Sequence, residues 1–129
     1  MPDRLLVDSD ICIDVIRSYT PTIARLERAE QMFIVAVSDI THMELLVGCA
    51  DKRQQSQTEK FLRRFEAVPV DAVVSGRTVE LLRRYRLSHG LLMADAFIAA
   101  TALVHALPLL TKNARDFRFI SGLTLEPYS

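Results

Sequence analysis

Four acidic side chains in this sequence could together bind a divalent cation. They are Asp8, Glu44, Asp95 and Asp116. Several carboxylates in one pocket repel each other and raise each other's pKa unless a cation lies between them. Ligand sets made only of oxygen atoms suit Mg²⁺ or Mn²⁺. A cation held in this way can polarise a phosphate and activate a water, so the four acids point to phosphodiester hydrolysis.

Asp95 lies in the most apolar stretch of the chain. From Leu91 to Val104, the residues other than Asp95 and Thr101 are all apolar or small. A helix that is apolar on all sides is buried, and a buried carboxylate without a partner costs free energy. Asp95 is therefore either a first-turn acid stabilised by the helix dipole or a ligand of a cation. The residue alone leaves both interpretations open.

The other three acids also have structural alternatives. Glu44 is predicted on the apolar face of its helix, where it needs a partner such as an arginine. Asp8 could end a strand or cap the following helix, and Asp116 could form a capping pair with Asn113. These explanations require four unrelated roles at one edge of a sheet. One shared metal site explains all four acids, and we favour it.

Short apolar segments predict the buried strands of a parallel sheet, whose ends must position these acids. The strands are expected at residues 5–7, 33–37, 67–70 and 107–110, and residues 123–125 could add another. Pro69 favours a short strand or an edge strand. Ligands of such sheets gather beyond the carboxyl ends of the strands. We expect supporting residues where polar side chains follow strands directly, at Asp10, Ser38 and Thr111.

Amphipathic segments between the strands predict the helices. The first three are expected at residues 11–16 with a cap at Ser9 or Asp10, at Pro21–Glu30, and at Ile40–Val47 between the cap Ser38 and the stop Gly48. A fourth should follow a polar loop at residues 51–56, with Phe61, Leu62 and Phe65 directed inward. The last two are expected at residues 72–87, with Val79, Leu82 and Leu87 opposite an arginine-rich face, and around Asp95. Alternating strands and helices predict an α/β fold. The expected architecture is a single-domain α/β/α sandwich with a central, mainly parallel sheet, covering residues 1–129.

The composition is that of an ordinary globular domain. Of the 129 residues, 50% are hydrophobic and 25% are charged. No apolar run reaches the length of a membrane span, and the first residues do not form a signal peptide. Cys12 and Cys49 have no motif spacing, so we expect two reduced thiols in a cytoplasmic protein that does not interact with membranes.

The net charge of zero hides two blocks of opposite sign. Residues 8–51 contain eight acidic and three basic side chains, whereas residues 60–86 contain seven basic and three acidic ones. A basic block either binds a polyanion or forms a solvated helix face. The candidates for contact with a polyanion are Arg83, Arg84, Lys112 and Arg115. No histidine is placed as a general base: His105 is expected as a helix-dipole partner, and His42 and His89 are expected at the surface. Water activation would therefore fall to a metal ion.

Four segments of the chain, taken in order, resemble a known family, the PIN-domain ribonucleases, especially the VapC toxins of prokaryotic toxin–antitoxin modules. The segments are Leu6–Asp10, Ser38–Gly48, Asp95–Leu103 and Thr111–Phe117. The resemblance covers nearly the whole chain and implies a PIN-like fold. It implies that the four acids bind Mg²⁺ or Mn²⁺ and are catalytic, with Ser9 and Asn113 as polar supports. The chain departs from the family at Asp10, where the family commonly has Asn, and this leaves the role of Asp10 open.

The resemblance also implies partners. The substrate would be single-stranded or structured RNA, and the protein would form a homodimer. A small antitoxin protein would cover the apolar grooves of the toxin and block its acidic pocket. Neither the RNA target nor the identity of the antitoxin follows from the residues.

Two other functions remain open on the residues alone. Asp8 and Asp10 resemble the strand-end pair of haloacid-dehalogenase-like phosphatases, with Asp8 as nucleophile and Asp10 as acid. The same pair resembles the acidic pocket of a receiver-like signalling module, with Asp71 as the phosphoacceptor. Glu44 has no role in the phosphatase, and the helix around Asp95 has no place in the receiver. We therefore favour the metal-dependent ribonuclease.

Overall fold

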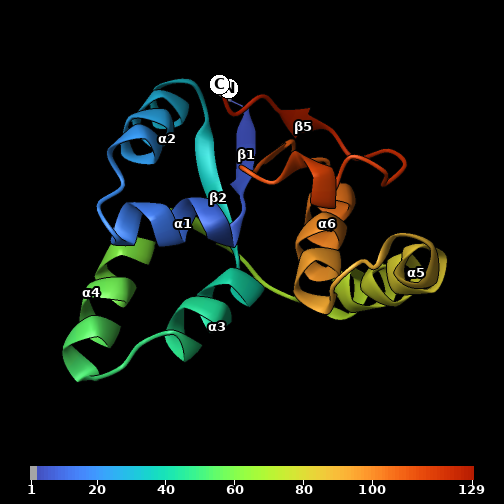
Figure 1. Cartoon of the computed structure of the whole chain (residues 1–129), viewed down its shortest axis with the longest axis horizontal. Helices are drawn as coiled ribbons and strands as arrows, with labels where there is room; N and C mark the ends of the chain where they lie inside the picture. The colour runs from blue at the N-terminus through green and yellow to red at the C-terminus, as the bar shows by residue number, and fades with distance from the viewer. Residues whose placement is uncertain (1–2) are drawn as a thin grey trace.

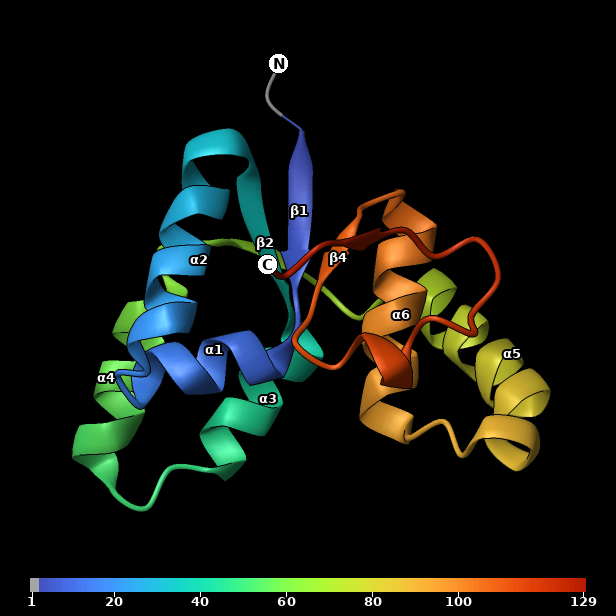
Figure 2. The ribbon, with the colours of Figure 1, turned by 45° about the horizontal axis from the view of Figure 1, so that its top comes forward.

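A parallel sheet of five strands forms the centre of the computed structural model, which describes residues 3–129. The strands are β1 (Arg4–Val7), β2 (Ile34–Ser38), β3 (Glu66–Val68), β4 (Leu109–Leu110) and β5 (Leu125–Glu126), in the order β3-β2-β1-β4-β5. All four neighbouring pairs are parallel. In the central strand β1, Leu6 lies opposite Ala36 of β2 and Leu109 of β4. The carboxyl ends of β1, β2 and β4 therefore meet at one edge of the sheet (Figures 1 and 2).

Helices cover both faces of this sheet, as the alternation of strands and helices predicted. The helices are α1 (Ser9–Ile16), α2 (Thr20–Met32), α3 (Asp39–Val47), α4 (Lys52–Leu62), α5 (Ala72–His89) and α6 (Met93–His105), with a short 3₁₀ turn, η1 (Ala114–Asp116). Figures 1 and 2 show α1, α2 and α4 on one side of the sheet and α5 and α6 on the other. Helix α3 lies across the carboxyl edge, where it contacts both α1 and α6. The expected α/β/α sandwich is confirmed.

Several predicted boundaries were wrong for local reasons. The polar loop predicted at residues 51–56 is the start of α4, because Asp51 caps the helix by accepting a hydrogen bond from the Gln54 amide at 2.8 Å. The cap of α1 is Asp8 rather than Ser9 or Asp10. Strand β3 ends at Val68, before Pro69, and lies at the edge of the sheet, as the proline predicted.

Helix α5 buries a face that overlaps only partly with the predicted one, since Leu82 is half-buried against the core. Val79 is 47% exposed and Leu87 is 98% exposed, so neither belongs to the core. The buried residues are Val74, Thr78, Leu81 and Tyr85, which repeat at the spacing of one helix face. Thr78 fits this apolar face because its hydroxyl donates to the Val74 carbonyl at 2.8 Å. The prediction failed because it selected apolar residues and excluded a threonine that satisfies its own hydroxyl.

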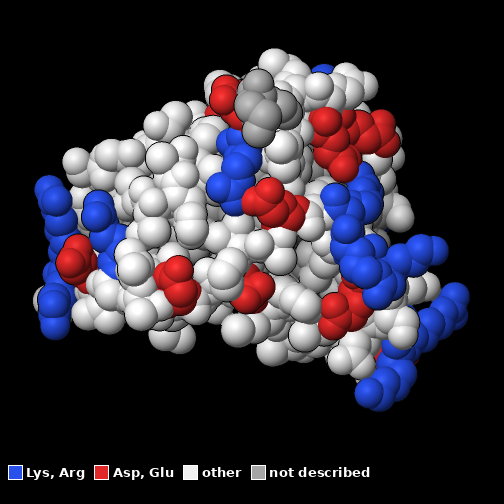
Figure 3. Space-filling view, turned by 180° about the vertical axis from the view of Figure 1, so that it is seen from behind, with Lys and Arg blue, Asp and Glu red and all other residues white. Residues whose placement is uncertain are grey.

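Basic side chains are divided between two ends of the molecule. In Figure 3 they gather over α4 at one end and over α5 at the other. Exposed examples are Lys52 and Arg53 on α4 and Arg77, Arg83 and Arg84 on α5. The basic block at residues 60–86 is therefore not one continuous face. None of the helices within residues 3–129 has both the length and the apolar character that crossing a membrane requires.

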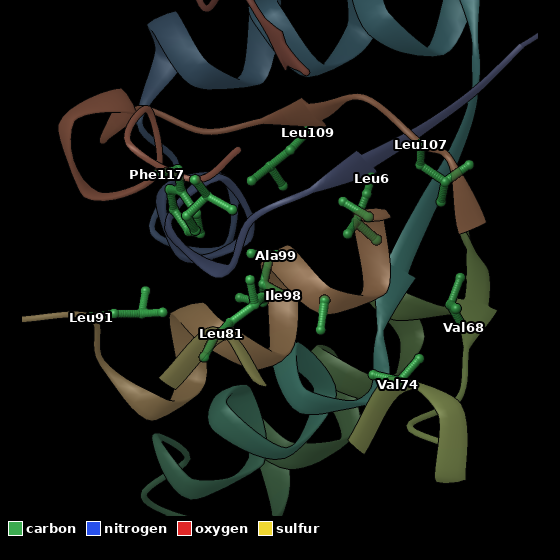
Figure 4. Close-up of a cluster of buried hydrophobic side chains, with 14 of the residues drawn as sticks. Leu6, Val68, Val74, Leu81, Leu91, Ile98, Ala99, Leu107, Leu109 and Phe117 are labelled. Carbon is green, nitrogen blue, oxygen red and sulfur yellow. The ribbon is translucent and has the colours of Figure 1, made fainter. Parts of the chain in front are cut away.

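The two faces of the sheet pack into two apolar clusters, because alternate strand residues point to opposite sides. Leu5 and Val7 contribute to the cluster beneath α1 and α2. Leu6 and Leu109 contribute to the cluster beneath α5 and α6. Figure 4 shows Leu6 and Leu109 near Ile98 and Ala99 of α6, with Phe117 beside them. The small residues of α6 let it pack closely on the sheet, and this packing fixes the position of Asp95 in its first turn.

Candidate active site

Asp8 is a buried carboxylate at the carboxyl end of the central strand. Its side chain is only 5% exposed. Oδ1 accepts a hydrogen bond from the Ser9 amide at 2.7 Å, and Oδ2 accepts one from the Thr111 hydroxyl at 2.8 Å. Burial and, next, the charge of Asp10 raise the pKa of Asp8 to about 8, against the lowering effect of these hydrogen bonds. The position therefore favours ionised Asp8 only if a cation is close.

Asp10 lies beside Asp8 and is contacted by two of the predicted supports, Thr111 and Asn113. Its Oδ2 accepts hydrogen bonds from the Lys112 amide and from Asn113 Nδ2, both at 3.0 Å. The Thr111 hydroxyl lies 3.3 Å from the same oxygen. Its Oδ1 is buried and has no hydrogen-bond partner among residues 3–129. Burial raises the pKa of Asp10, so this carboxyl also lacks a compensating positive charge.

Glu44 is exposed, which contradicts its predicted place on the apolar face of α3. The physical reason is that α3 lies across the edge of the sheet and leaves this side uncovered. The Glu44 Oε1 atom accepts a hydrogen bond from the Ser9 hydroxyl at 2.6 Å. The Ser9 hydroxyl also lies 2.8 Å from the Thr41 hydroxyl. Since Ser9 has one hydroxyl hydrogen, Thr41 donates to Ser9 while Ser9 donates to Glu44.

Thr41 is a support that the sequence analysis missed. It is fully buried and precedes Glu44 by three residues on α3. This spacing places both side chains on one face of the helix, and it was the available signal. The predicted support Ser9 thus connects α1 to two residues of α3.

Asp95 combines the two interpretations left open by the sequence. It lies in the first turn of α6, where the helix dipole favours a negative charge. Its carboxylate makes no hydrogen bond or ion pair to the rest of residues 3–129. Burial, followed by the charges of Asp116, Glu44 and Asp10, raises its pKa to about 6. The helix dipole therefore does not compensate the charge of Asp95 fully.

The four predicted acids and Asp10 lie at the same edge of the sheet. Asp8 is close enough to Asp10 and Asp95 for their charges to raise its pKa, and Asp95 responds in the same way to Asp116 and Glu44. Asp116 is exposed at the end of η1. No lysine or arginine of the described chain forms an ion pair with any of these five acids. We call Asp8, Asp10, Glu44, Asp95 and Asp116 the acidic group.

The acidic group is open rather than a closed cage of ligands. Among residues 3–129, no three His, Cys, Asp or Glu side chains converge on one point at metal-ligand spacing. Neighbouring donors instead hold the carboxylates of Asp8 and Glu44. Mg²⁺ commonly keeps several waters and binds only one or two carboxylates directly. The all-oxygen donor set, the partnerless Asp10 Oδ1 and the absence of basic partners in the described chain therefore fit a hydrated divalent cation.

Two other predicted site residues have structural roles. Ser38 caps α3, since its hydroxyl accepts a hydrogen bond from the Ile40 amide at 3.2 Å. The ammonium group of Lys112 donates to Asp14 at 2.6 Å and lies 4.9 Å from the centre of the Tyr19 ring. This ion pair joins the loop after β4 to α1.

The histidines and cysteines lie outside the acidic group. His42 lies 2.9 Å from Glu59, and His105 is in the last turn of α6, where it was expected. His89 is exposed at the end of α5. Cys12 and Cys49 are free, and burial raises the pKa of the Cys12 thiol.

A hollow of about 600 Å³ adjoins the acidic group. Asp95 and Asp116 line it together with Arg115, which was predicted, and with His89, Arg118 and Phe119, which were not. No local sequence pattern indicated the last three, because they come from the end of α5 and from the loop after η1. Arg83 and Arg84 do not line this hollow.

The two other functions find no support in the geometry. A phosphatase would need a lysine beside its Asp pair, but the Lys112 ammonium group is bound to Asp14. The receiver would need Asp71 as phosphoacceptor, but Asp71 caps α5 by accepting from the Val74 amide at 2.9 Å. The Lys112 ammonium group and the Asp71 carboxylate are thus both bound outside the acidic group.

Comparison with known proteins gives consistent matches over almost the whole chain. The family model described as the PIN domain matches residues 5–122. Ribonuclease VapC10 of Mycobacterium tuberculosis is 32% identical over 120 residues, which cover 92% of this chain and 90% of that protein. The DNA-bound VapBC structure from Salmonella typhimurium covers 100% of both chains at a TM-score of 0.81 and 26% identity. A toxin–antitoxin complex from Klebsiella pneumoniae covers 93% of this chain and 95% of its own, with a TM-score of 0.75 and 31% identity.

The raised pKa values predict how stability depends on pH without metal. The folded protein binds protons on Asp8, with its pKa of about 8, and on Asp95, with its pKa of about 6, more tightly than the unfolded chain, for which 3.8 applies. Their contribution to stability is complete below about pH 4 and is lost as the pH rises through about 6 and about 8. In EDTA, the melting temperature should therefore fall between about pH 5 and pH 8, and Mg²⁺ should reduce the fall. A melting temperature that stays flat or rises over this range would contradict the prediction.

Asp95→Asn should separate repulsion from a helix-dipole role. Removing one of several carboxylates that repel each other should let the metal-free variant melt at or above the wild type near pH 8. A matched control is Asp39→Asn, which removes the first-turn acid of α3 outside the acidic group. The control should melt slightly lower, because it loses only a favourable dipole interaction. If both variants melt lower by similar amounts, Asp95 acts as an ordinary first-turn acid.

Proposed function

Because the chain belongs to the PIN-domain family, we propose that it is a ribonuclease that hydrolyses phosphodiester bonds of RNA. The match to the PIN-domain model confirms the family resemblance that the four sequence segments indicated. Ribonuclease VapC10, which matches nearly the whole chain, supports the same activity. The proposed catalytic residues are Asp8, Glu44, Asp95 and Asp116, with Asp10 as an additional member of the site.

One observation carries the proposal: the acidic group gathers carboxylates at the carboxyl edge of the sheet with no basic partner in the described chain. Burial and the charges of neighbouring carboxylates raise the pKa values of Asp8 and Asp95. The ionised forms of these two residues therefore oppose folding. A purely structural cluster would be expected to have a lysine or arginine close by, since buried charges are usually paired. The arrangement instead suits the binding of a cation and, through it, of a phosphate.

The acidic group would hold Mg²⁺ or Mn²⁺. When bound, such a cation supplies charge neutralisation at the scissile phosphate and lowers the pKa of a water so that it can act as a nucleophile. Ser9 fixes the position of Glu44, and Thr41 fixes the position of Ser9. Thr111 holds the carboxyl group of Asp8. These uncharged supports orient the carboxylates and leave their negative charge available.

Asn113 takes the place of a basic partner for Asp10. The side-chain nitrogen Nδ2 of Asn113 and the backbone amide of Lys112 both donate to the same oxygen of Asp10, Oδ2. The other oxygen, Oδ1, is left free of hydrogen bonds from the described residues. We infer that the additional charge of Asp10, where the family commonly has Asn, lets this oxygen contribute to the cation site.

We also propose that the protein is the toxin of a toxin–antitoxin pair and binds a small antitoxin protein. The likeness to the Klebsiella pneumoniae toxin–antitoxin complex supports this partner. A hollow of about 470 Å³ between α1, α3 and α4 offers a place for it. Ile13, Ile16 and Leu45 form an apolar part of this hollow, and polar residues line much of the rest, among them Glu44 of the acidic group. A segment bound there would reach the acidic group.

The remaining parts of the proposal concern assembly and location. We propose a homodimer, for which exposed Leu87, Leu92 and Met93 provide apolar surface. We also propose that the protein acts in the cytoplasm, in keeping with its two free cysteines.

The first test of function is cleavage of RNA. The purified protein should degrade single-stranded RNA in Mg²⁺ or Mn²⁺, and EDTA should stop the reaction. Asp95→Asn should lower the rate at least about a hundredfold, the upper range for loss of a group that supports a metal site. Asp51→Asn is the matched control: the same chemical change in a distant helix cap, which should leave the rate per folded molecule unchanged. EDTA-resistant cleavage by the protein, or hydrolysis of a chromogenic phosphomonoester, would refute the mechanism.

A second test concerns the basic side chains of α5. Replacing both Arg83 and Arg84 with Ala should make RNA binding less dependent on salt, because each phosphate contact contributes about 0.7 to the slope of log K against log salt for single strands. The expected reduction is about 1.4 if both contact RNA. The matched control replaces Lys52 and Arg53 on α4, at the other basic end of the molecule (Figure 3). Equal slopes for the wild type and the α5 variant would remove this face from RNA binding.

A third test concerns the antitoxin. Expression of the chain alone should arrest growth, and co-expression of its small partner protein should restore it. Ile16→Arg replaces an apolar side chain of this hollow with a charged one and should abolish the rescue while toxicity persists. Met32→Arg, at another exposed apolar position on α2, should be toxic and still rescued. Rescue of Ile16→Arg as efficiently as the control would show that the partner binds elsewhere.

A further inference from the structure

The hollow beside the acidic group has an aromatic wall and a basic rim. His89 and Phe119 form the wall, and Arg115 and Arg118 lie at the rim. Asp95 and Asp116 line the same hollow, so it is continuous with the acidic group. A molecule bound by the acids would therefore extend into this space.

The aromatic wall is held in place by several contacts. The rings of His89 and Phe119 are stacked, with centroids 4.3 Å apart and an interplanar angle of 9°. Tyr85 contacts the His89 ring edge-on at 5.8 Å, and the Ser88 hydroxyl lies 2.7 Å from His89 Nδ1. His89 is nevertheless exposed, so part of its ring is accessible while Phe119 covers one face. A ring that is already oriented loses little freedom when a ligand stacks on it.

The fold provides two anchors for this wall. The Tyr85 hydroxyl accepts a hydrogen bond from the Ser121 amide at 3.0 Å and so ties the loop that carries Phe119 to α5. Gly90 adopts a left-handed conformation with φ of 72°, which turns the chain sharply after His89. Arg86 donates to the carbonyls of Gly90 and Leu91 at 3.1 and 3.2 Å and holds this turn. Arg86 is therefore committed to the turn rather than to a ligand.

Arg115 and Arg118 are free to bind an anion. Both are exposed, and neither forms an ion pair with any acid of residues 3–129. They lie beside Asp116, yet they leave it unpaired. Aromatic side chains next to arginines are the usual means of binding single-stranded nucleic acid, with bases stacked on rings and phosphates on guanidinium groups.

We propose that this hollow binds one unpaired nucleotide of the RNA substrate next to the scissile phosphate, with its base stacked on His89 and its phosphate near Arg115 and Arg118. This inference rests on the proposed ribonuclease function and adds which residues contact the base and the phosphate beside the cleavage point. A base within a duplex has both faces covered by neighbouring bases and cannot stack on His89. The hollow thus selects loops and single strands over helices.

The test uses a short single-stranded RNA that carries one 2-aminopurine, whose fluorescence is quenched by stacking. Binding is measured in EDTA, where no cleavage is expected. The wild type should quench the fluorescence, and His89→Ala should bind about tenfold more weakly and lose most of the quenching. His89→Phe provides an aromatic ring and should restore both signals. His89→Lys provides a positive charge without a ring and should not.

Two controls separate this proposal from the proposed function. His42→Ala removes a histidine that contacts Glu59 and does not line the hollow, and it should leave binding and quenching unchanged. The matching RNA duplex should bind more weakly and should respond equally to the wild type and to His89→Ala. If the wild type binds and cleaves RNA but His89→Ala binds with unchanged affinity and quenching, the nucleotide site is refuted and the ribonuclease function stands. If the wild type neither binds nor cleaves RNA, both the nucleotide site and the ribonuclease function are refuted. If a variant does not fold, quenching of the 2-aminopurine by the wild type decides whether a base stacks in the hollow.

Discussion

The repulsion among carboxylates at the carboxyl edge of the sheet is the constraint on which the rest of the structure depends. Burial and neighbouring charges raise the pKa of Asp8 and Asp95, and the described chain contributes no lysine or arginine to offset them. Hydrogen bonds from Ser9, Thr111 and Asn113 compensate part of this cost. The packing of the rest of the fold has to offset the remaining free-energy cost. A cation bound among the carboxylates would relieve the same cost.

The apolar core supplies this support because it shares its elements with the site. Helix α6 packs Ile98 and Ala99 against the sheet, and the same helix carries Asp95 in its first turn (Figure 4). Strand β1 buries Leu5, Leu6 and Val7, and Asp8 follows it directly. Three neighbouring strands end at this edge, so small shifts of the core would move several carboxylates at once. Stability and the geometry of the site are coupled through these shared elements.

Acidic and basic side chains lie side by side at this edge of the sheet. The acidic group occupies the edge of the sheet, whereas Arg115 and Arg118 lie at the rim of the adjoining hollow. The loop after β4 serves both regions: its amides hold Asp10, and η1 carries Arg115 and Asp116. Lys112 joins this loop to α1 through Asp14. A net charge of zero therefore conceals a surface with sharply separated local charge.

The sequence by itself determined the four acids, the strands and the parallel α/β architecture, because these follow from local patterns. Short apolar segments followed by acids define strand ends, and an acid within an apolar helix is visible without a structure. Only the tertiary structure decided that α5 turns Tyr85 inward, that Glu44 is exposed beside Ser9, and that Thr41 contacts Ser9 while His89 lines the hollow with Asp95. These features depend on contacts between residues far apart in the chain, such as Tyr85 with Ser121, 36 positions away. A helix shows several faces that could be buried, and the element that packs against it determines which one is.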